Sequence, residues 1–274
     1  MNPYSVDPNG SSSDPATLVI DSPAAPDGAQ FNQAGNSIDA GRATAWYGYG
    51  FDQFKINAGV WIGMVVVLFL MMMVLAFIPV LGSLASNVLM PVFFGGLMLA
   101  CQASREGRPV TFDYLFAGFK DKFGSLALLG VFWMIAALII GLVAGLFAAL
   151  LFGGAIATGA LTGAAGMSGG AGLLGLGITA ILGFVVVAMI ISIPIAMAIW
   201  FAPALVVFHN LAPIDALMTS LKASLKNWVA FLVFFILYIV FAIIATIPLG
   251  LGWLVLGPVL IGAMYAAYRD IFLK

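Results

Sequence analysis

The sequence predicts an all-α polytopic membrane protein with six transmembrane helices. Two observations support this prediction: the apolar composition of the chain and its six long apolar runs. Apolar residues make up 63% of the chain and charged residues 8%, and the mean hydropathy is +1.15. Soluble globular domains have about 25% charged residues. Because about 20 apolar residues span the hydrocarbon core as a helix, each run below is long enough to cross it. The runs are 58–78, 82–103, 124–152, 174–208, 228–247 and 251–268.

Basic residues occur only at alternate connections between these runs. They are Arg42, Lys55, Arg105, Arg108, Lys120, Lys122, Lys222, Lys226, Arg269 and Lys274. The other connections, near 79–86, 153–175 and 247–253, contain no Lys, Arg, Asp or Glu. Cytoplasmic loops accumulate Lys and Arg, whereas exported loops do not. The sequence therefore predicts a multi-pass protein of the bacterial inner (cytoplasmic) membrane with its N- and C-termini in the cytoplasm.

Two regions differ in composition. Residues 1–41 are rich in Ser, Pro, Asp, Asn and Gly, contain several aspartates and contain no base. Such a segment cannot bury enough apolar surface to offset the entropy of ordering, so we expect a disordered acidic cytoplasmic tail. Residues 42–274 form the predicted six-span membrane domain.

The membrane domain repeats itself in three units, at about 43–104, 111–208 and 213–270. The second and third units begin with apolar residues of identical spacing. These are Phe112, Leu115, Phe116, Phe119 and Phe123, and then Ile214, Leu217, Met218, Leu221 and Leu225. This spacing places apolar residues along one side of a helix, and the stretch 43–55 resembles a degraded copy. Each unit is therefore predicted as a cytoplasmic amphipathic helix followed by a two-span hairpin.

The middle unit has an expanded connection at 153–177 that is rich in glycine. We expect a flexible outer loop or helix ends packed through small residues; the alternative is a re-entrant segment lining a pore. The sequence also leaves open whether 174–208 is one kinked helix or a span followed by a separate turn.

The spans contain no set of groups suited to catalysis. They have no paired carboxylates and no buried Lys or Arg. Proton relays and ion-coupled carriers require such ionisable groups within the membrane. His209 is interpreted as a helix-end residue and Cys101 as a small apolar helix residue. We therefore predict no enzyme activity, no catalytic, cofactor-binding or metal site, and no nucleic-acid partner.

Basic residues beside the membrane are candidates for binding lipid headgroups. They are Arg105, Arg108, Lys120, Lys122, Lys222 and Lys226. Anionic headgroups attract such side chains by about 1 kcal/mol each. The alternative is that these residues only set the topology of the cytoplasmic loops.

Two stretches resemble a known group of proteins. They are PVFFGGLMLACQASREGRPVTFDYLFAGFKDKFG and FAPALVVFHNLAPIDALMTSLKASLKNW. They are similar to bacterial inner-membrane proteins without an assigned reaction, which include the YciC-like proteins and the membrane domain found beside glycerophosphodiester phosphodiesterases. The resemblance covers about residues 42–274. It implies a polytopic inner-membrane protein and offers no catalytic residues.

Two functional hypotheses follow. The first is a non-enzymatic integral inner-membrane protein that binds membrane phospholipids or a membrane-protein partner, as an accessory or scaffold. The second is a passive or lipid-handling permease that uses a cleft between the helix hairpins. A repeat of this kind and the prolines within spans motivate the second hypothesis.

Overall fold

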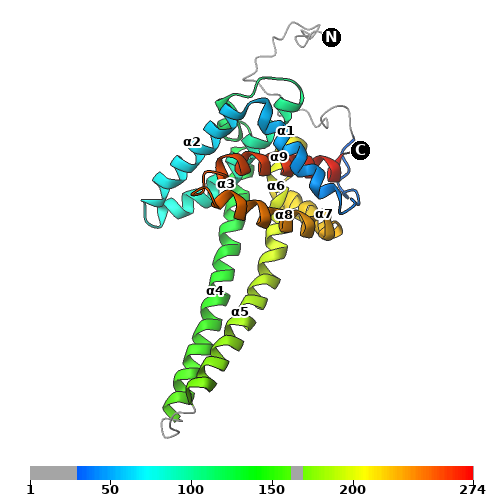
Figure 1. Ribbon diagram of the computed structural model, residues 1–274. Coiled ribbons are helices and arrows are strands. Elements are labelled where there is room, and N and C mark those ends of the chain that lie inside the picture. The colour runs from blue at the N-terminus through cyan, green and yellow to red at the C-terminus, as the bar shows by residue number, and fades with distance from the viewer. Residues whose placement is uncertain (1–29, 162–168, 274) are drawn as a thin grey trace, which may run out of the picture. The chain divides into compact units, whose positions relative to one another are not determined.

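The computed structural model describes residues 30–161 and 169–273, and these residues are mainly helical (Figure 1). The helices are α1 (Arg42–Ile56), α2 (Ala58–Ala76), α3 (Leu81–Arg105), the 3₁₀ helix η2 (Phe112–Phe119), α4 (Phe123–Leu161), α5 (Gly169–Trp200), α6 (Ala202–His209), α7 (Pro213–Lys226), α8 (Trp228–Thr246) and α9 (Trp253–Phe272). In the described residues, 6 helical segments are long and apolar enough to cross a membrane. The predicted all-α polytopic fold is confirmed.

The described chain divides into two compact units. Unit 1 comprises residues 30–131 and 197–273, and unit 2 comprises residues 132–196. Unit 1 contains α1, η2 and α7, which begin the three repeats and which we call their short helices. It also contains α6 and the hairpins α2–α3 and α8–α9. In unit 2, the rings of Phe147 and Phe184 pack with their centroids 5.9 Å apart.

Each short helix of unit 1 packs on the second span of the preceding repeat. Helix η2 packs on α3, and α7 packs on α6, which continues the second span of the middle repeat. The short helix of the first repeat, α1, packs on α9, the second span of the third repeat. The three repeats are therefore arranged cyclically, with α1 completing the last one.

The same close approach recurs at two of these crossings. A Cβ atom added at Gly50 of α1 would lie 2.1 Å from the carbonyl oxygen of Val259. A Cβ atom added at Gly118 of η2 would lie 2.2 Å from the carbonyl oxygen of Val92. Both valines directly follow a proline inside the span. Only glycine allows backbones to approach so closely in these helix pairs.

The third crossing uses a hydroxyl group instead of a glycine. Ser220 of α7, at the position that corresponds to Gly118, is fully buried. Its Oγ donates to the carbonyl of Met197 at 2.7 Å and accepts from the backbone N–H of Phe201 at 3.1 Å. These backbone groups adjoin the break between α5 and α6. Ser220 therefore satisfies polar groups that the interrupted helix leaves open.

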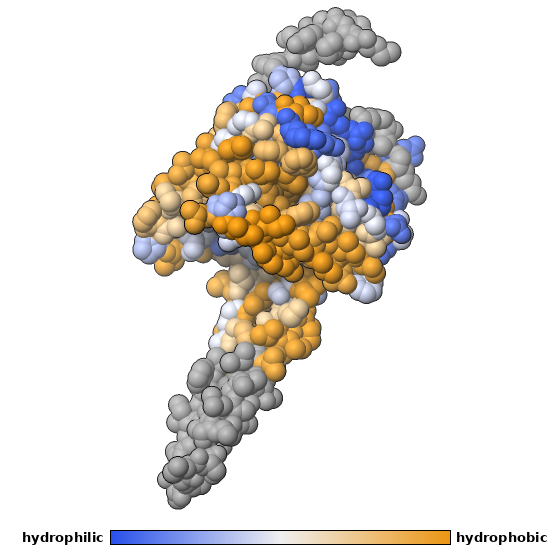
Figure 2. All heavy atoms as spheres, viewed as in Figure 1, coloured by the Kyte–Doolittle hydropathy of each residue, from blue (hydrophilic) through white to orange (hydrophobic). Residues whose placement is uncertain are grey.

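The second spans of the two described hairpins form much of the core of unit 1. In the most hydrophobic windows of α3 and α9, 56% of the residues are buried, against 11% for α2 and 22% for α8. In a bilayer the apolar side chains exposed on α2 and α8 face lipid. Figure 2 shows hydrophilic residues concentrated toward one end of this unit and an apolar surface over much of the rest of the visible face.

Three details differ from the sequence-based expectations or complete them. The predicted amphipathic helix after Thr111 is a 3₁₀ helix, whose narrower cross-section suits the close approach to α3. The segment 174–208 is two helices, because the backbone breaks at Phe201 before α6 begins. Within the glycine-rich segment 153–177, α4 continues to Leu161 and α5 begins at Gly169, so much of the expected connection is helix. Residues 162–168 lie outside the described residues.

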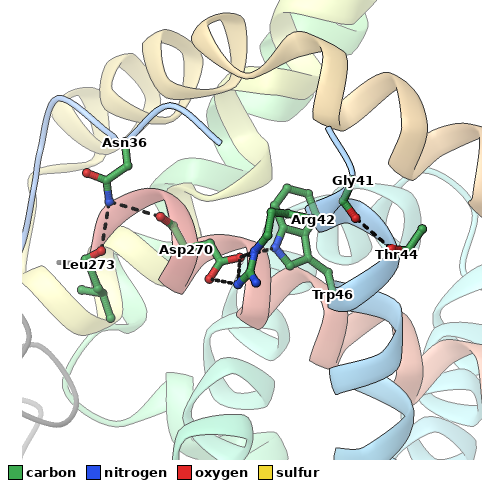
Figure 3. Close-up of polar contacts among 7 residues, drawn as sticks. All are labelled: Asn36, Gly41, Arg42, Thr44, Trp46, Asp270 and Leu273. Atoms are coloured by element: carbon green, nitrogen blue, oxygen red, sulfur yellow. Dashed lines mark hydrogen bonds and ion pairs between the residues drawn. The ribbon is translucent and has the colours of Figure 1, made fainter. Parts of the chain in front are cut away.

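The predicted disordered tail, residues 1–41, needs correction in its last part. Residues 1–29 lie outside the described residues, but residues 30–41 form an ordered strap across the end of α9. Asn36 donates its backbone N–H to the carbonyl of Ile271 at 2.6 Å. Its side-chain amide donates to the carbonyls of Asp270 at 3.1 Å and Leu273 at 2.9 Å (Figure 3). Carbonyls in the last turn of a helix lack partners within it. Composition gave no sign that this strap would supply them.

Candidate functional site

Helices η2 and α7 expose large apolar side chains at equivalent positions. The exposed residues are Phe112, Phe116 and Phe123 around η2, and Ile214, Met218 and Leu225 on α7. The lysines at the matching positions, Lys120 and Lys222, are also exposed. By contrast, Leu115 in the same apolar stripe is buried. Helix η2 thus buries one edge of its stripe, whereas the matching Leu217 of α7 is only partly buried against the core. Both helices leave the other edge of the stripe exposed beside a lysine.

Helix α1 has a similar exposed edge. Phe51 and Ile56 are exposed, and the Lys55 ammonium lies 5.0 Å from the centroid of the Phe51 ring. An apolar strip flanked by lysine is typical of a helix that lies in the membrane–water interface. We call α1, η2 and α7 the interfacial helices.

The predicted headgroup candidates lie in different surroundings. Arg108 donates to the Glu106 carboxylate and to the Tyr114 hydroxyl. Lys122 donates to the Asn210 side chain at 2.6 Å, and Lys226 donates to the Gly35 carbonyl at 2.8 Å. These three residues therefore contribute hydrogen bonds within unit 1. Lys120 and Lys222 lie on the exposed edges described above.

Arg105, the remaining candidate, lines a pocket between α1, α3 and α9. The pocket has a volume of about 450 Å³. Its polar and aromatic lining residues are Arg42, Trp46, Tyr49, Arg105, Arg269 and Asp270. We call it the arginine pocket. The structure thus brings Arg105 together with two arginines that are 63 residues before it and 164 residues after it in the sequence.

Asp270 organises one wall of the arginine pocket. Its carboxylate accepts hydrogen bonds from Nε and Nη2 of Arg42 at 2.9 Å each, and from the indole Nε1 of Trp46 at 2.8 Å. Figure 3 shows both side chains of α1 converging on this carboxylate of α9. The side chain of Arg42 is 53% exposed and that of Asp270 is 24% exposed. Asp270 therefore joins α1 to α9 and fixes the direction of the Arg42 guanidinium.

Sequence reasoning did not single out Arg42, Trp46, Arg269 or Asp270 as parts of a site. These residues belong to the first short helix and the last span, and no local motif joins them. The repeat could have predicted the contact between the first short helix and the last span. If each short helix packs on the span before it, the surface of the last span is left for the first short helix.

The other residues considered for chemistry lie in packed surroundings. His209, at the end of α6, stacks on the Phe31 ring with centroids 3.7 Å apart, and its Nε2 hydrogen-bonds the Tyr268 hydroxyl. Cys101 is fully buried in α3. In the described part of the chain, no cluster of three or more His, Cys, Asp or Glu side chains could hold a metal ion.

Comparison with known proteins gives one match of note. The chain is 27% identical over 218 residues to a probable inner membrane protein of Burkholderia thailandensis, and the alignment covers 78% of each chain. No protein-family model matches the chain. No solved structure matches it. The similarity and the six apolar helices together support a multi-pass location in the inner membrane, as the sequence predicts.

Proposed function

We propose that the chain is a non-enzymatic inner-membrane protein that binds anionic phospholipid through its interfacial helices and acts there as an accessory or scaffold. The observation that supports this most is the matched exposure of Phe112 with Ile214, Phe116 with Met218 and Phe123 with Leu225. Exposed apolar side chains lower the free energy of a helix at the acyl boundary, and nearby lysines are attracted to anionic headgroups.

The proposal includes the orientation and the resemblance given by the sequence. The basic ends of the spans would face the cytoplasm, where anionic lipids attract Lys and Arg. The similarity to the YciC-like proteins is part of the same proposal and rests on the two sequence stretches that resemble them.

The permease alternative receives less support in unit 1. A passage between hairpins needs space between second spans and their neighbours. At the α1–α9 and α3–η2 crossings, however, backbones approach closely enough that an added Cβ would collide with a carbonyl oxygen.

Topology reporters test the proposed orientation. A reporter fused after residue 165 should be active on the periplasmic side, whereas reporters fused after residues 115 and 215 should be active in the cytoplasm. The physical reason is the confinement of Lys and Arg to one set of connections. The reverse pattern of reporter activity would contradict the proposal.

Lipid retention tests the proposed function itself. The protein purified in mild detergent should retain anionic phospholipid in excess over its share in the bulk membrane, as measured by lipid mass spectrometry. A variant with Lys55→Gln, Lys120→Gln and Lys222→Gln should lose most of this enrichment, since each lysine near the surface contributes about 1 kcal/mol.

The matched control replaces the same three lysines with arginine, which keeps the charge and should keep the enrichment. Equal lipid profiles for the glutamine and arginine variants would exclude the interfacial lysines as the binding groups. If purified protein retained no phospholipid at all, and crosslinking in cells captured no partner, the accessory role would have to be abandoned.

A further inference from the structure

The arginine pocket has the charge of an anion-binding site. Among its lining residues, three arginines and one aspartate leave a formal charge of +2. The three guanidinium groups come from separate elements: the first turn of α1, the last turn of α3 and the last turn of α9. Like charges that folding brings to one pocket repel one another. A bound dianion would reverse that cost.

The geometry of the pocket suits a phosphate group. The guanidinium of arginine is planar and presents its donors as a fork, which matches the oxygens of a phosphate better than an ammonium does. Asp270 accepts from Nε and Nη2 of Arg42 and so fixes the direction of this guanidinium, which meets a ligand through its remaining N–H groups. Trp46 and Tyr49 add aromatic surface to the same wall. A site with a few placed charges beside aromatic walls is typical for small ligands.

We propose that the arginine pocket binds a phosphomonoester, whose phosphate lies between Arg42, Arg105 and Arg269. A phosphomonoester carries a charge between −1.5 and −2 near neutral pH, which matches the +2 of the pocket. A phosphodiester headgroup carries a single negative charge and compensates the pocket only in part. Asp270 is a positioning residue in this site, because it orients Arg42 and carries the wrong charge to contact the ligand favourably.

Two sources can supply this chemistry. One is phosphatidic acid, a lipid whose headgroup is a phosphomonoester and whose chains would stay in the bilayer. The other is a soluble phosphomonoester that enters from the aqueous side. The volume of about 450 Å³ lies in the range of small-ligand sites and accepts either group.

Binding measurements with the full-length protein test the site. Isothermal titration calorimetry in neutral detergent uses glycerol 3-phosphate and inorganic phosphate as soluble probes. Native mass spectrometry uses phosphatidic acid or phosphatidylglycerol in phosphatidylcholine nanodiscs. We expect saturable binding in at least one arm, with phosphatidic acid bound more tightly than phosphatidylglycerol. Binding confined to the lipid arm identifies a headgroup site, and binding of glycerol 3-phosphate identifies a soluble ligand.

Substitutions assign the binding to the pocket. Arg105→Gln and Arg269→Gln should each weaken binding about tenfold, because each removes a charge-assisted hydrogen bond to the phosphate. Arg269→Lys keeps the charge without the fork and should fall between Arg269→Gln and the unchanged protein. The control is Gly48→Ala on α1, where an added Cβ meets nothing within 4 Å, and this variant should bind the probes as the unchanged protein does. The lipid-enrichment test of the proposed function changes Lys55, Lys120 and Lys222 and not the pocket, so either proposal can fail without the other.

The proposal is overturned if neither arm shows saturable binding. It is also overturned if a folded double variant, Arg105→Gln with Arg269→Gln, binds as tightly as the unchanged protein. Should that double variant not purify as a monodisperse species, the Arg105→Gln variant decides in the same way, because its side chain lies at the exposed end of α3.

Discussion

Replacing Gly50 with alanine will destabilise the protein by about 3 kcal/mol, at the upper end of what overpacking typically costs. The added Cβ would lie 2.1 Å from the carbonyl oxygen of Val259 and 2.8 Å from the backbone nitrogen of Ala263. Both atoms belong to the backbone of α9, so no side-chain rotation can relieve the collision. Helix α1 must move away from α9, and the contacts of Trp46 and Tyr47 with the rest of the core must change with it.

Gly48→Ala is the matched control, two residues away on the same helix. A Cβ at Gly48 meets nothing within 4 Å. Because glycine in a helix interior costs about 0.5–1 kcal/mol relative to alanine, this variant should be as stable as the unchanged protein or slightly more stable. Melting temperatures in neutral detergent, followed by size-exclusion chromatography after heating, measure both variants. Equal melting temperatures for the two alanine variants would show that α1 and α9 do not cross at Gly50.

Asp270→Ala should lower the free energy of unfolding by about 2–4 kcal/mol. The main reason is Trp46, whose side chain is almost fully buried and whose indole N–H loses its acceptor at a cost of about 1–3 kcal/mol. The bidentate pair with Arg42 adds less, because Arg42 is half exposed and solvent screens the pair. Asp270→Asn keeps an acceptor for the indole and should fall between Asp270→Ala and the unchanged protein.

Asp52→Ala provides the comparison for a surface pair. Asp52 and Lys55 form an ion pair of 2.7 Å within α1, with side chains that are 69% and 56% exposed. Such pairs contribute about 0.3–0.5 kcal/mol, so this variant should melt close to the unchanged protein. The measurement is chemical or thermal unfolding of both variants in the same detergent. A loss for Asp52→Ala as large as that for Asp270→Ala would contradict the role assigned to the α1–α9 junction.

The sequence predicted the spans well because lipid leaves few options for an apolar run of that length. The repeat and its short helices also followed from spacing, and α7 begins at Pro213 as a proline in the first helical turn suggests. The break at Phe201 was left open, since a proline within an apolar run permits a kinked helix or two helices. The 3₁₀ form of η2 was missed, because over only 8 residues the apolar spacing of a 3₁₀ helix and that of an α-helix are hard to tell apart.

The candidate site was predicted only in part. Of the six basic candidates, Lys120 and Lys222 lie on exposed interfacial edges and Arg105 lies in the pocket. Arg108, Lys122 and Lys226 form hydrogen bonds within the protein. The local sequence shows which loops carry positive charge, but it does not show which hydrogen-bond acceptors the folded protein places beside each basic side chain. The pocket depends on Asp270 meeting Arg42 from the other end of the chain, which spacing along a single helix cannot reveal.

The cyclic order of the repeats has a consequence for biosynthesis. A ribosome delivers α1 first, yet the surface that covers Gly50 and Trp46 emerges only when the final span has been translated. Until then α1 lacks the helix on which it packs. Insertion of the earlier spans and final assembly of the protein are therefore separated in time. A nascent chain halted before residue 250 should therefore keep its spans inserted while its amino-terminal helix stays open to protease.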